Sequence, residues 1–427
     1  MKKVALDKQH IHSPYTGGKQ GMKKMALIGL ITLALGACSE SEENEEDNGT
    51  QNYNASQLQT YKSAIPQSSR LNVNAEQSLS RASSAQVQPQ AVGDAIYPAF
   101  AVTVASSINN TVTSLIEGLE HVVSLPPTLF DSDEKKFIWG PWDNEDGYGK
   151  MLVYIQENGQ EDDGSDPEFQ YSYALTRMAA DGDLEKSAVV IWGAATPDTE
   201  DENHGTGVTL WDFEANNAFE NTYNPSPDIG HEQGRFISFY KYDEEAGDGE
   251  YLINYSVFRN VVFEEGYPPA NNEVFYGRFV DTDGSELGNP GNSVGFMDWV
   301  ITTDLCDGDG ACFDSKDTSN VSEDETMRIH LAFFNDGKGR AEARLSGGDL
   351  STNHDLIECW DTLFEQDYLF FNGADLVGSE SACSPVFDDS LTDLDIPAID
   401  DIDTDVREDM ICVAKNGLEA CEESETQ

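Results

Sequence analysis

From residue 137 onward, hydrophobic and polar residues alternate in short runs, which is the period of a β-strand with one buried face. Late in the chain, Ile329 and Leu331 fall on one side of such a run, whereas Arg328 and His330 fall on the other and are expected at the surface. The sequence Asn-Asp-Gly-Lys-Gly at 335–339 then predicts a hairpin turn into the next strand. About ten to twelve such runs follow one another, separated by Gly, Asp and Asn. No helical pattern separates them, as parallel strands would require, so we predict an all-β domain, a mainly antiparallel barrel or sandwich.

One stretch before these strands has the period of a helix. Between Pro98 and Pro126, apolar residues recur at spacings of three and four, which places them on one face of a helix. They are Ile108, Val112, Leu115, Ile116, Leu119, Val122 and Val123. Proline suits the first turn of a helix, and the pair Pro126-Pro127 ends one. We therefore expect one N-terminal amphipathic helix packed on or in the β-domain; contact with a partner or a membrane is the alternative for this face.

The N-terminal region has neither period. Lys23 and Lys24 precede an apolar stretch at 25–36, which is shorter than the about 20 residues of a membrane-spanning helix but has the shape of a secretory signal. The sequence Leu-Gly-Ala-Cys that ends at Cys38 resembles the lipobox of bacterial lipoproteins. In that family the cysteine is lipidated, the signal is removed, and the cysteine becomes the first residue. The resemblance covers residues 22–38, and it implies a signal region over 1–37. Met22 begins a normal-looking signal and is a candidate for the true start, with Met1 as the alternative.

Composition divides the rest of the chain into three parts. Residues 38–95 are rich in Ser, Gln, Asn and acidic residues, so they cannot bury enough apolar area to offset the entropy of folding. We expect the lipidated cysteine and a disordered polar tether there, with a root-mean-square reach of about 40 Å. Residues 96–375 hold the helix and the antiparallel β-domain. Residues 376–427 alternate aspartate with aliphatic residues and predict an acidic, disulfide-containing tail.

Six cysteines remain when Cys38 is set aside, and an even number in an exported chain indicates disulfides. The disulfide candidates are Cys306, Cys312, Cys359, Cys383, Cys412 and Cys421. Short separations favour pairing within 306–312 and within 412–421. A zinc site is the alternative, but the chain has no Cys-x-x-Cys pair.

The formal net charge of −54 comes from 79 acidic and 25 basic residues. It argues against nucleic acid or an anionic membrane surface as a partner, because both require basic patches. One explanation of the negative charge is a solvated acidic surface that keeps the protein soluble at high salt. The other is binding of a divalent cation. Hard cations need several oxygen ligands from a compact loop, and the candidate calcium ligands are Asp304, Asp307, Asp309 and Asp314. Asp281–Glu286 and Asp143–Asp146 are weaker candidates, and none of these loops has the EF-hand order.

No residue is predicted to be catalytic. The motif Gly-x-Ser-x-Gly at 291–295 follows turn residues and precedes a strand pattern, whereas a nucleophile elbow needs a strand before the serine and a helix after it. Trp139 and Trp142 lie in the least strand-like context of the six tryptophans and are candidates for an exposed aromatic platform that binds sugar.

These observations favour a lipid-anchored lipoprotein of a Gram-negative envelope, whose acidic β-domain is not an enzyme and binds a glycan, a hydrophobic ligand or another envelope protein. Ser39 favours the outer membrane, because an aspartate after the lipidated cysteine retains members of the resembled family at the inner membrane. Two alternatives stay open: a secreted glycan-active hydrolase with paired carboxylates, and a calcium-dependent adhesion module. No cofactor other than calcium is expected, and the membrane contact would run through lipid on Cys38.

Overall fold

The computed structural model of the protein describes residues 53–73, 79, 93–143, 149–160, 167, 169–198, 205–223, 233–245, 249–262, 270–285, 287–303, 324–348, 350 and 352–383. The strands are β1 (Leu129–Asp131), β2 (Lys136–Asp143), β3 (Lys150–Glu157), β4 (Tyr171–Met178), β5 (Ser187–Pro197), β6 (Gly205–Asp212), β7 (Gln233–Glu245), β8 (Gly249–Val262), β9 (Ala270–Asp281), β10 (Asn292–Thr303), β11 (Glu325–Phe334), β12 (Gly339–Gly347), β13 (His354–Trp360), β14 (Gln366–Phe371) and β15 (Ala374–Gly378). The helices are α2 (Ala55–Lys62), α3 (Ser68–Leu71), α5 (Tyr97–Ser124) and α6 (Phe213–Tyr223), with short 3-10 turns η1 (Leu184–Lys186) and η3 (Glu380–Ala382).

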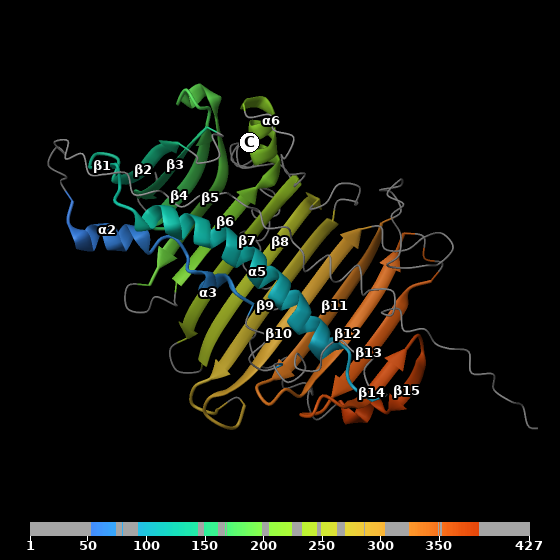
Figure 1. Ribbon diagram of the computed structural model, residues 1–427. Helices are drawn as coiled ribbons and strands as arrows, with labels where there is room; N and C mark the ends of the chain where they lie inside the picture. Colours follow the sequence, from blue (N-terminus) through green and yellow to red (C-terminus); the bar gives the residue numbers. More distant parts are fainter. Residues whose placement is uncertain are drawn as a thin grey trace, which may run out of the picture.

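All fifteen strands belong to one antiparallel sheet in which spatial order follows the chain from β1 to β15 (Figure 1). The prediction of a mainly antiparallel β-domain is confirmed. The sheet is open, since β1 and β15 each pair with one strand, so the expected closed barrel or two-sheet sandwich is corrected to a single open sheet. The sheet also continues past the domain boundary expected at residue 375, because β15 pairs with β14.

Local sequence explains why each strand turns back on the previous one. The hairpin expected at 335–339 joins β11 to β12, where Phe333 lies opposite Gly339. Between β13 and β14, the Asp361 side chain accepts hydrogen bonds from the backbone N–H groups of Leu363 and Glu365 and closes the turn. Helix α6 was not expected between strands; the Asp212 carboxylate caps its first turn by accepting from the N–H of Ala215.

The sheet has two different faces. Helix α5 lies diagonally across one of them (Figure 1), and its buried apolar side chains share one core with strand residues on that face. We call this the helix face and the opposite side the outer face. On β7, Phe236 and Tyr240 belong to the helix-face core, whereas Ile237 and Phe239 belong to a separate cluster on the outer face. By length and composition alone α5 could cross a membrane, but a core helix passes the same test.

Part of the segment expected to be a disordered tether is built into this core. Residues 53–73 include α2 and α3, and the side chains of Tyr61, Ile65, Leu71 and Val73 are buried in the helix-face core. The tether prediction is therefore wrong over 53–73. Its polar composition concealed a few apolar anchors, whose burial together with fixed hydrogen bonds offsets the entropy of ordering this short segment.

Candidate functional site

Two asparagines hold the segment that ends at Val73 between α5 and the helix face of the sheet. Asn109 of α5 accepts a hydrogen bond from the N–H of Val73 at 2.6 Å and donates one to the carbonyl of Val73 at 3.0 Å. From the other side, the buried Asn254 of β8 donates to the carbonyl of Leu71. An amide side chain satisfies backbone donors and acceptors where no strand partner exists, and buried backbone groups must be satisfied. The segment after α3 is therefore fixed between α5 and the sheet.

Small polar side chains line the sheet below this segment. Thr209, Ser238 and Ser256 lie opposite one another on β6, β7 and β8, and each is fully buried. Tyr173 fills the neighbouring position on β4, where its hydroxyl lies 2.5 Å from the hydroxyl of Thr209. Helix α3 contacts β7. The row of small side chains gives the backbone of α3 room to approach the sheet.

Aromatic residues close the helix face at the β1 end of the sheet. The ring of Tyr61 from α2 meets the rings of Phe130, Phe137 and Tyr171 edge-on, with centroid separations of 6.4, 4.8 and 5.2 Å. Its hydroxyl donates to Glu157 at 3.1 Å. Burial, followed by the negative charge of Glu157, raises the pKa of Tyr61 well above its usual range, so this phenol stays protonated.

A buried carboxylate closes the helix face at the other end. Glu358 of β13 accepts hydrogen bonds from the backbone N–H groups of Ile96 and Tyr97 at 2.8 and 2.9 Å, where α5 begins. Gln366 donates to the same carboxylate. Burial raises the pKa of Glu358, although the bonds from Tyr97, Gln366 and Ile96 lower it. A carboxylate at this position satisfies orphan N–H groups and faces the positive end of the helix dipole, which is a structural role.

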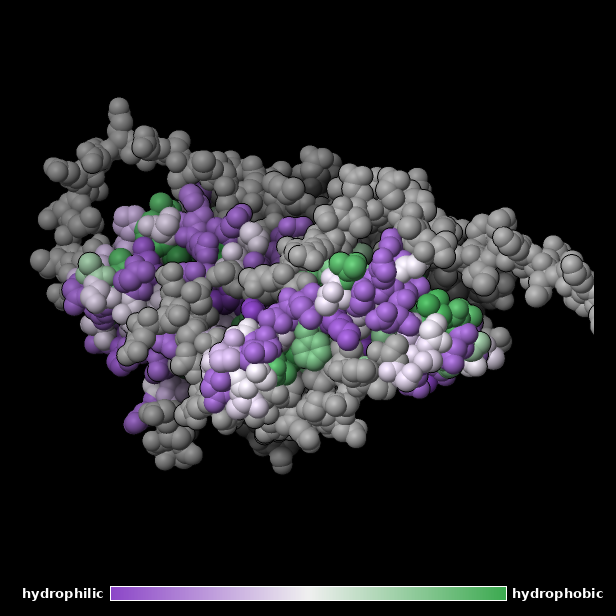
Figure 2. Space-filling view, turned by 90° about the horizontal axis from the view of Figure 1, so that it is seen from below, coloured by the Kyte–Doolittle hydropathy of each residue, from purple (hydrophilic) through white to green (hydrophobic). Residues whose placement is uncertain are grey.

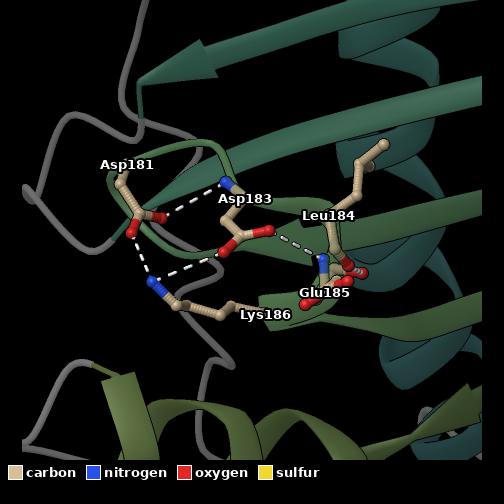
Figure 3. Close-up of polar contacts among 6 residues, drawn as sticks. Asp181, Asp183, Leu184, Glu185 and Lys186 are labelled. Carbon is tan, nitrogen blue, oxygen red and sulfur yellow. Dashed lines mark hydrogen bonds and ion pairs between the residues drawn. The ribbon is translucent and has the colours of Figure 1, made fainter.

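In two acidic turns of the described part, the carboxylates bond to groups of the same turn. In the β4–β5 turn, Asp181 and Asp183 both contact the ammonium of Lys186 (Figure 3). The hydrogen bond from Lys186 is the main reason that the pKa of Asp181 is lowered. In the weaker calcium candidate after β9, the Asp281 carboxylate accepts from the N–H groups of Gly284 and Leu287. Over the described residues, no three His, Cys, Asp or Glu side chains come together as a metal site.

The β15 edge of the sheet is open by contrast. All five residues of β15 are exposed, and β14 is its one partner strand in the described part of the chain. Phe371, Leu376 and Val377 are exposed there, with 52 % of Leu376 accessible. Seen from below, the apolar residues of the described part form separate patches among hydrophilic ones, and one patch lies on the side where Figure 1 has β13–β15 (Figure 2). Within the described residues, this edge offers backbone groups without a strand partner beside apolar side chains.

Most residues predicted from the sequence lie elsewhere. Cys38, Cys306, Cys312, Cys412 and Cys421 and the candidate calcium ligands Asp304, Asp307, Asp309 and Asp314 are outside the described residues, as is most of the acidic tail. Of the disulfide candidates, Cys359 and Cys383 are bonded to each other, with their Cα atoms 5.7 Å apart.

Three surface predictions have different outcomes. His330 is exposed on β11, as predicted. Ser293 of the Gly-x-Ser-x-Gly motif is a buried residue of β10 after a turn at Gly291, as its context indicated. The expected aromatic platform is wrong: Trp139 is fully buried, with its indole N–H donating to the carbonyl of Leu125, and Trp142 packs against the helix-face core.

The residues that organise this region were missed by sequence reasoning. Asn109, Asn254 and Glu358 are ordinary polar residues in the sequence, and their partners are 36, 183 and about 260 positions away. No local signal identifies such contacts. The exposed edge had one signal, the short Ala-Asp-Leu-Val-Gly run at 374–378, which falls at the predicted boundary between domain and tail.

Comparison with known proteins gives no further assignment: no protein-family model, no curated protein and no solved structure matches this chain.

Proposed function

We propose that the protein is a lipid-anchored envelope lipoprotein, at the outer membrane, whose acidic β-domain is not an enzyme and binds an extended segment of another envelope protein at the β15 edge. The observation that carries the proposal is the contrast within one sheet. Its helix face is occupied by α3 and α5 of the same chain, while the β15 edge keeps exposed apolar side chains. Because α5 covers the helix face, that face is not available to a partner, whereas the β15 edge is exposed.

The anchor would lie close to the domain. With lipid on Cys38, only the 14 residues from 39 to 52 separate it from Tyr53, which contacts Phe130 and Phe137 beside β1. A flexible chain of this length has a root-mean-square reach of about 20 Å, half the distance that the longer tether would give. The lipid would thus hold the β1 end near the membrane. The serine at position 39 supports the outer membrane as the location.

A non-catalytic role is supported by how the buried acids are used. Glu358, whose pKa is raised by burial, already accepts hydrogen bonds from Ile96, Tyr97 and Gln366. It lies fully buried beneath α5. A general acid must reach the substrate atom that it protonates, and this carboxylate faces the start of a helix.

The exposed residues of the β15 edge indicate what kind of partner segment would bind there. A strand that is added to an exposed edge gains main-chain hydrogen bonds and places alternate side chains beside its neighbours, so an extended segment with aliphatic residues at alternate positions would fit Phe371, Leu376 and Val377. A second copy of this chain fits less well. Pairing β15 with the β1 edge of another copy is head-to-tail and would continue into a filament, and a net charge of −54 opposes self-association.

Site-specific photo-crosslinking tests the edge in cells. A photoreactive amino acid in place of Leu376 should form a covalent product with one envelope protein. The matched control replaces Leu363, which is 67 % exposed in the turn before β14 and lies off the edge strand. A partner captured equally from both positions, or a product that contains only copies of this chain, contradicts partner binding at the edge.

A further inference from the structure

The β15 edge has two sides, and each side belongs to one face of the sheet. On β13, Glu358 points to the helix face, where it contacts the start of α5, and Cys359 points to the outer face. Tyr368 of β14 lies opposite Cys359 and packs with it, so the next side chain on β14, Leu369, points to the helix face. Side chains that lie opposite each other in an antiparallel pair share a face. The pairing of β14 with β15 therefore shows which side of the edge each residue of β15 lines.

The helix-face side of the edge is apolar. Val377 lies opposite the half-buried Leu369. Ala374 lies opposite Phe371, and a register shift leaves Leu376 as an extra residue on β15. Phe371 and Val377 are 39 % and 37 % exposed, near the end of the sheet where α5 begins (Figure 1). These side chains form a strip that the aliphatic side chains of an added strand can cover.

The outer side of the edge is acidic. Asp375 lies opposite Phe370, which packs on the outer face. Asp375 is exposed, and its carboxylate accepts a hydrogen bond from the hydroxyl of Tyr368 at 2.8 Å. Burial, then the hydrogen bond to Asp375 and the negative charges of Asp375 and Glu380, raises the pKa of Tyr368 to about 12. Arg340 acts in the opposite direction and lies 3.8 Å from Glu380.

The last three strands carry negative charge without Lys or Arg. Residues 354–383, from β13 to the disulfide, contain seven Asp and Glu and no Lys or Arg. In the described part of the chain, the carboxylate of Asp375 bonds to a neutral hydroxyl rather than to a basic side chain. A negative surface attracts a positively charged segment and repels an acidic one. The edge therefore combines negative charge on its outer side with an apolar strip on its helix-face side.

We propose that the segment bound at the β15 edge is a strand in which aliphatic and basic residues alternate, an inference that rests on the proposed function and names the chemistry of the partner. A strand that is hydrogen-bonded to β15 turns successive side chains to opposite faces of the sheet. Its aliphatic side chains cover Phe371 and Val377, and its Lys or Arg side chains pair with Asp375. Oppositely charged cross-strand pairs stabilise a sheet. The β1 edge of a second copy, Leu-Phe-Asp at 129–131, lacks this pattern.

Synthetic peptides test the pattern on the purified full-length protein. A short peptide of alternating valine and lysine should bind, and hydrogen exchange of the protein should slow at 374–378. A peptide of alternating valine and glutamate should not bind. A peptide with its valines and lysines in separate blocks has the same charge as the first but lacks the alternation, so it should not slow exchange at the edge. High salt should weaken binding of the first peptide, because salt screens exposed charges.

Two edge variants and a matched control separate the charge from the apolar strip. Asp375→Asn keeps an acceptor for the hydroxyl of Tyr368 but removes the charge, so the valine–lysine peptide should bind about two- to fivefold more weakly, the effect of one exposed ion pair. Val377→Ser should weaken binding without changing its salt dependence. The control Glu117→Gln removes one exposed negative charge from α5 and should leave binding unchanged.

The possible results distinguish this inference from the proposed function. If the valine–glutamate peptide binds as well as the valine–lysine peptide, or if Asp375→Asn behaves like Glu117→Gln, the edge does not select basic residues and the inference alone is wrong. If no peptide slows exchange at 374–378, the inference is also wrong, and photo-crosslinking at Leu376 in cells decides partner binding separately. A crosslinked partner whose captured segment has no alternating Lys or Arg would overturn the inference and leave partner binding in place.

Discussion

The two ends of the sheet differ in how their edge strands are covered: residues of α2 pack at the β1 end, whereas β15 is exposed. In the part of the chain that the structure describes, each edge strand has backbone groups without a strand partner, which is a hazard that proteins cover or exploit. At the β1 end, α2 brings Tyr61 over Phe130 and Phe137, so a segment of the chain itself closes the end. At the β15 end, every residue of the edge strand is exposed. In the proposed function, the covered end lies near the N-terminal anchor and the open end binds the partner.

The largest effect is expected at the covered end. Tyr61→Ala removes a buried ring with three aromatic contacts, so the free energy of unfolding should fall by about 3–5 kcal/mol. Tyr61→Phe removes only the bond to Glu157 and should lower it by about 1 kcal/mol. Urea unfolding measures both, with the exposed Thr60→Ala as control. If Tyr61→Ala unfolds like the control, α2 does not close this end.

A smaller loss is expected where α5 meets β13. Glu358→Ala leaves the N–H groups of Ile96 and Tyr97 without their acceptor, and should lower the free energy of unfolding by about 2–4 kcal/mol. Glu358→Gln keeps the shape and one acceptor oxygen, so its loss should be smaller. An alanine variant as stable as the wild type would show that the start of α5 does not depend on this carboxylate.

The same carboxylate predicts a pH dependence. Burial raises the pKa of Glu358 in the folded protein, so between the ordinary glutamate pKa of about 4.3 and the raised value, the folded state binds more protons than the unfolded state. Stability from this group therefore falls as the pH rises through that window. Urea unfolding of wild type and Glu358→Gln over a pH series isolates the effect, because the fall should be larger in the wild type than in the variant. Identical pH profiles would contradict it.

The polar clamp on the N-terminal segment should have an intermediate effect. Asn109→Ala removes both hydrogen bonds to Val73 and should lower the free energy of unfolding by about 1–3 kcal/mol. Asn109→Asp keeps the acceptor for the N–H of Val73 and loses the donor to its carbonyl. Hydrogen exchange at Val73 should accelerate in the alanine variant more than in the aspartate variant. Equal exchange in both variants and the wild type would show that Asn109 does not hold this segment.

The smallest effect on stability is expected at the open end. Leu376→Lys changes an exposed side chain, so the free energy of unfolding should change by less than about 0.5 kcal/mol. A lysine on an edge strand opposes strand addition, so the partner identified by the crosslink at 376 should no longer be recovered with the Leu376→Lys variant in a pull-down. A variant that loses stability but keeps the partner would reverse the roles assigned to the two ends.

These differences also explain how far the sequence could be read. The alternation around Arg328 and His330 and the turn at 335–339 predicted β11 and β12, because a period of two and an Asp-Gly turn are local signals. Contacts that depend on distant residues had no such signal. Glu358 is one of 79 acidic residues. Its partner Tyr97, at the start of α5, is 261 positions away in the sequence.

The covered end of the sheet was missed for a related reason. Residues 53–73 have the composition of a disordered segment, yet Tyr61, Leu71 and Val73 are buried in the core. The unexpected segment changes the functional interpretation, because it shortens the chain between Cys38 and the domain. Composition averages over a window, whereas a few well-placed anchors decide whether a segment packs.

We propose that the N-terminus attaches the domain to the membrane through lipid on Cys38. Cells that produce the full-length wild type or Cys38→Ser should be labelled with a clickable palmitate analogue and separated into membrane and soluble fractions. The account predicts label and membrane sedimentation for the wild type, and neither label nor sedimentation for a folded Cys38→Ser variant. A Cys38→Ser variant that still sediments with membranes, or that still incorporates the lipid label, would contradict the account.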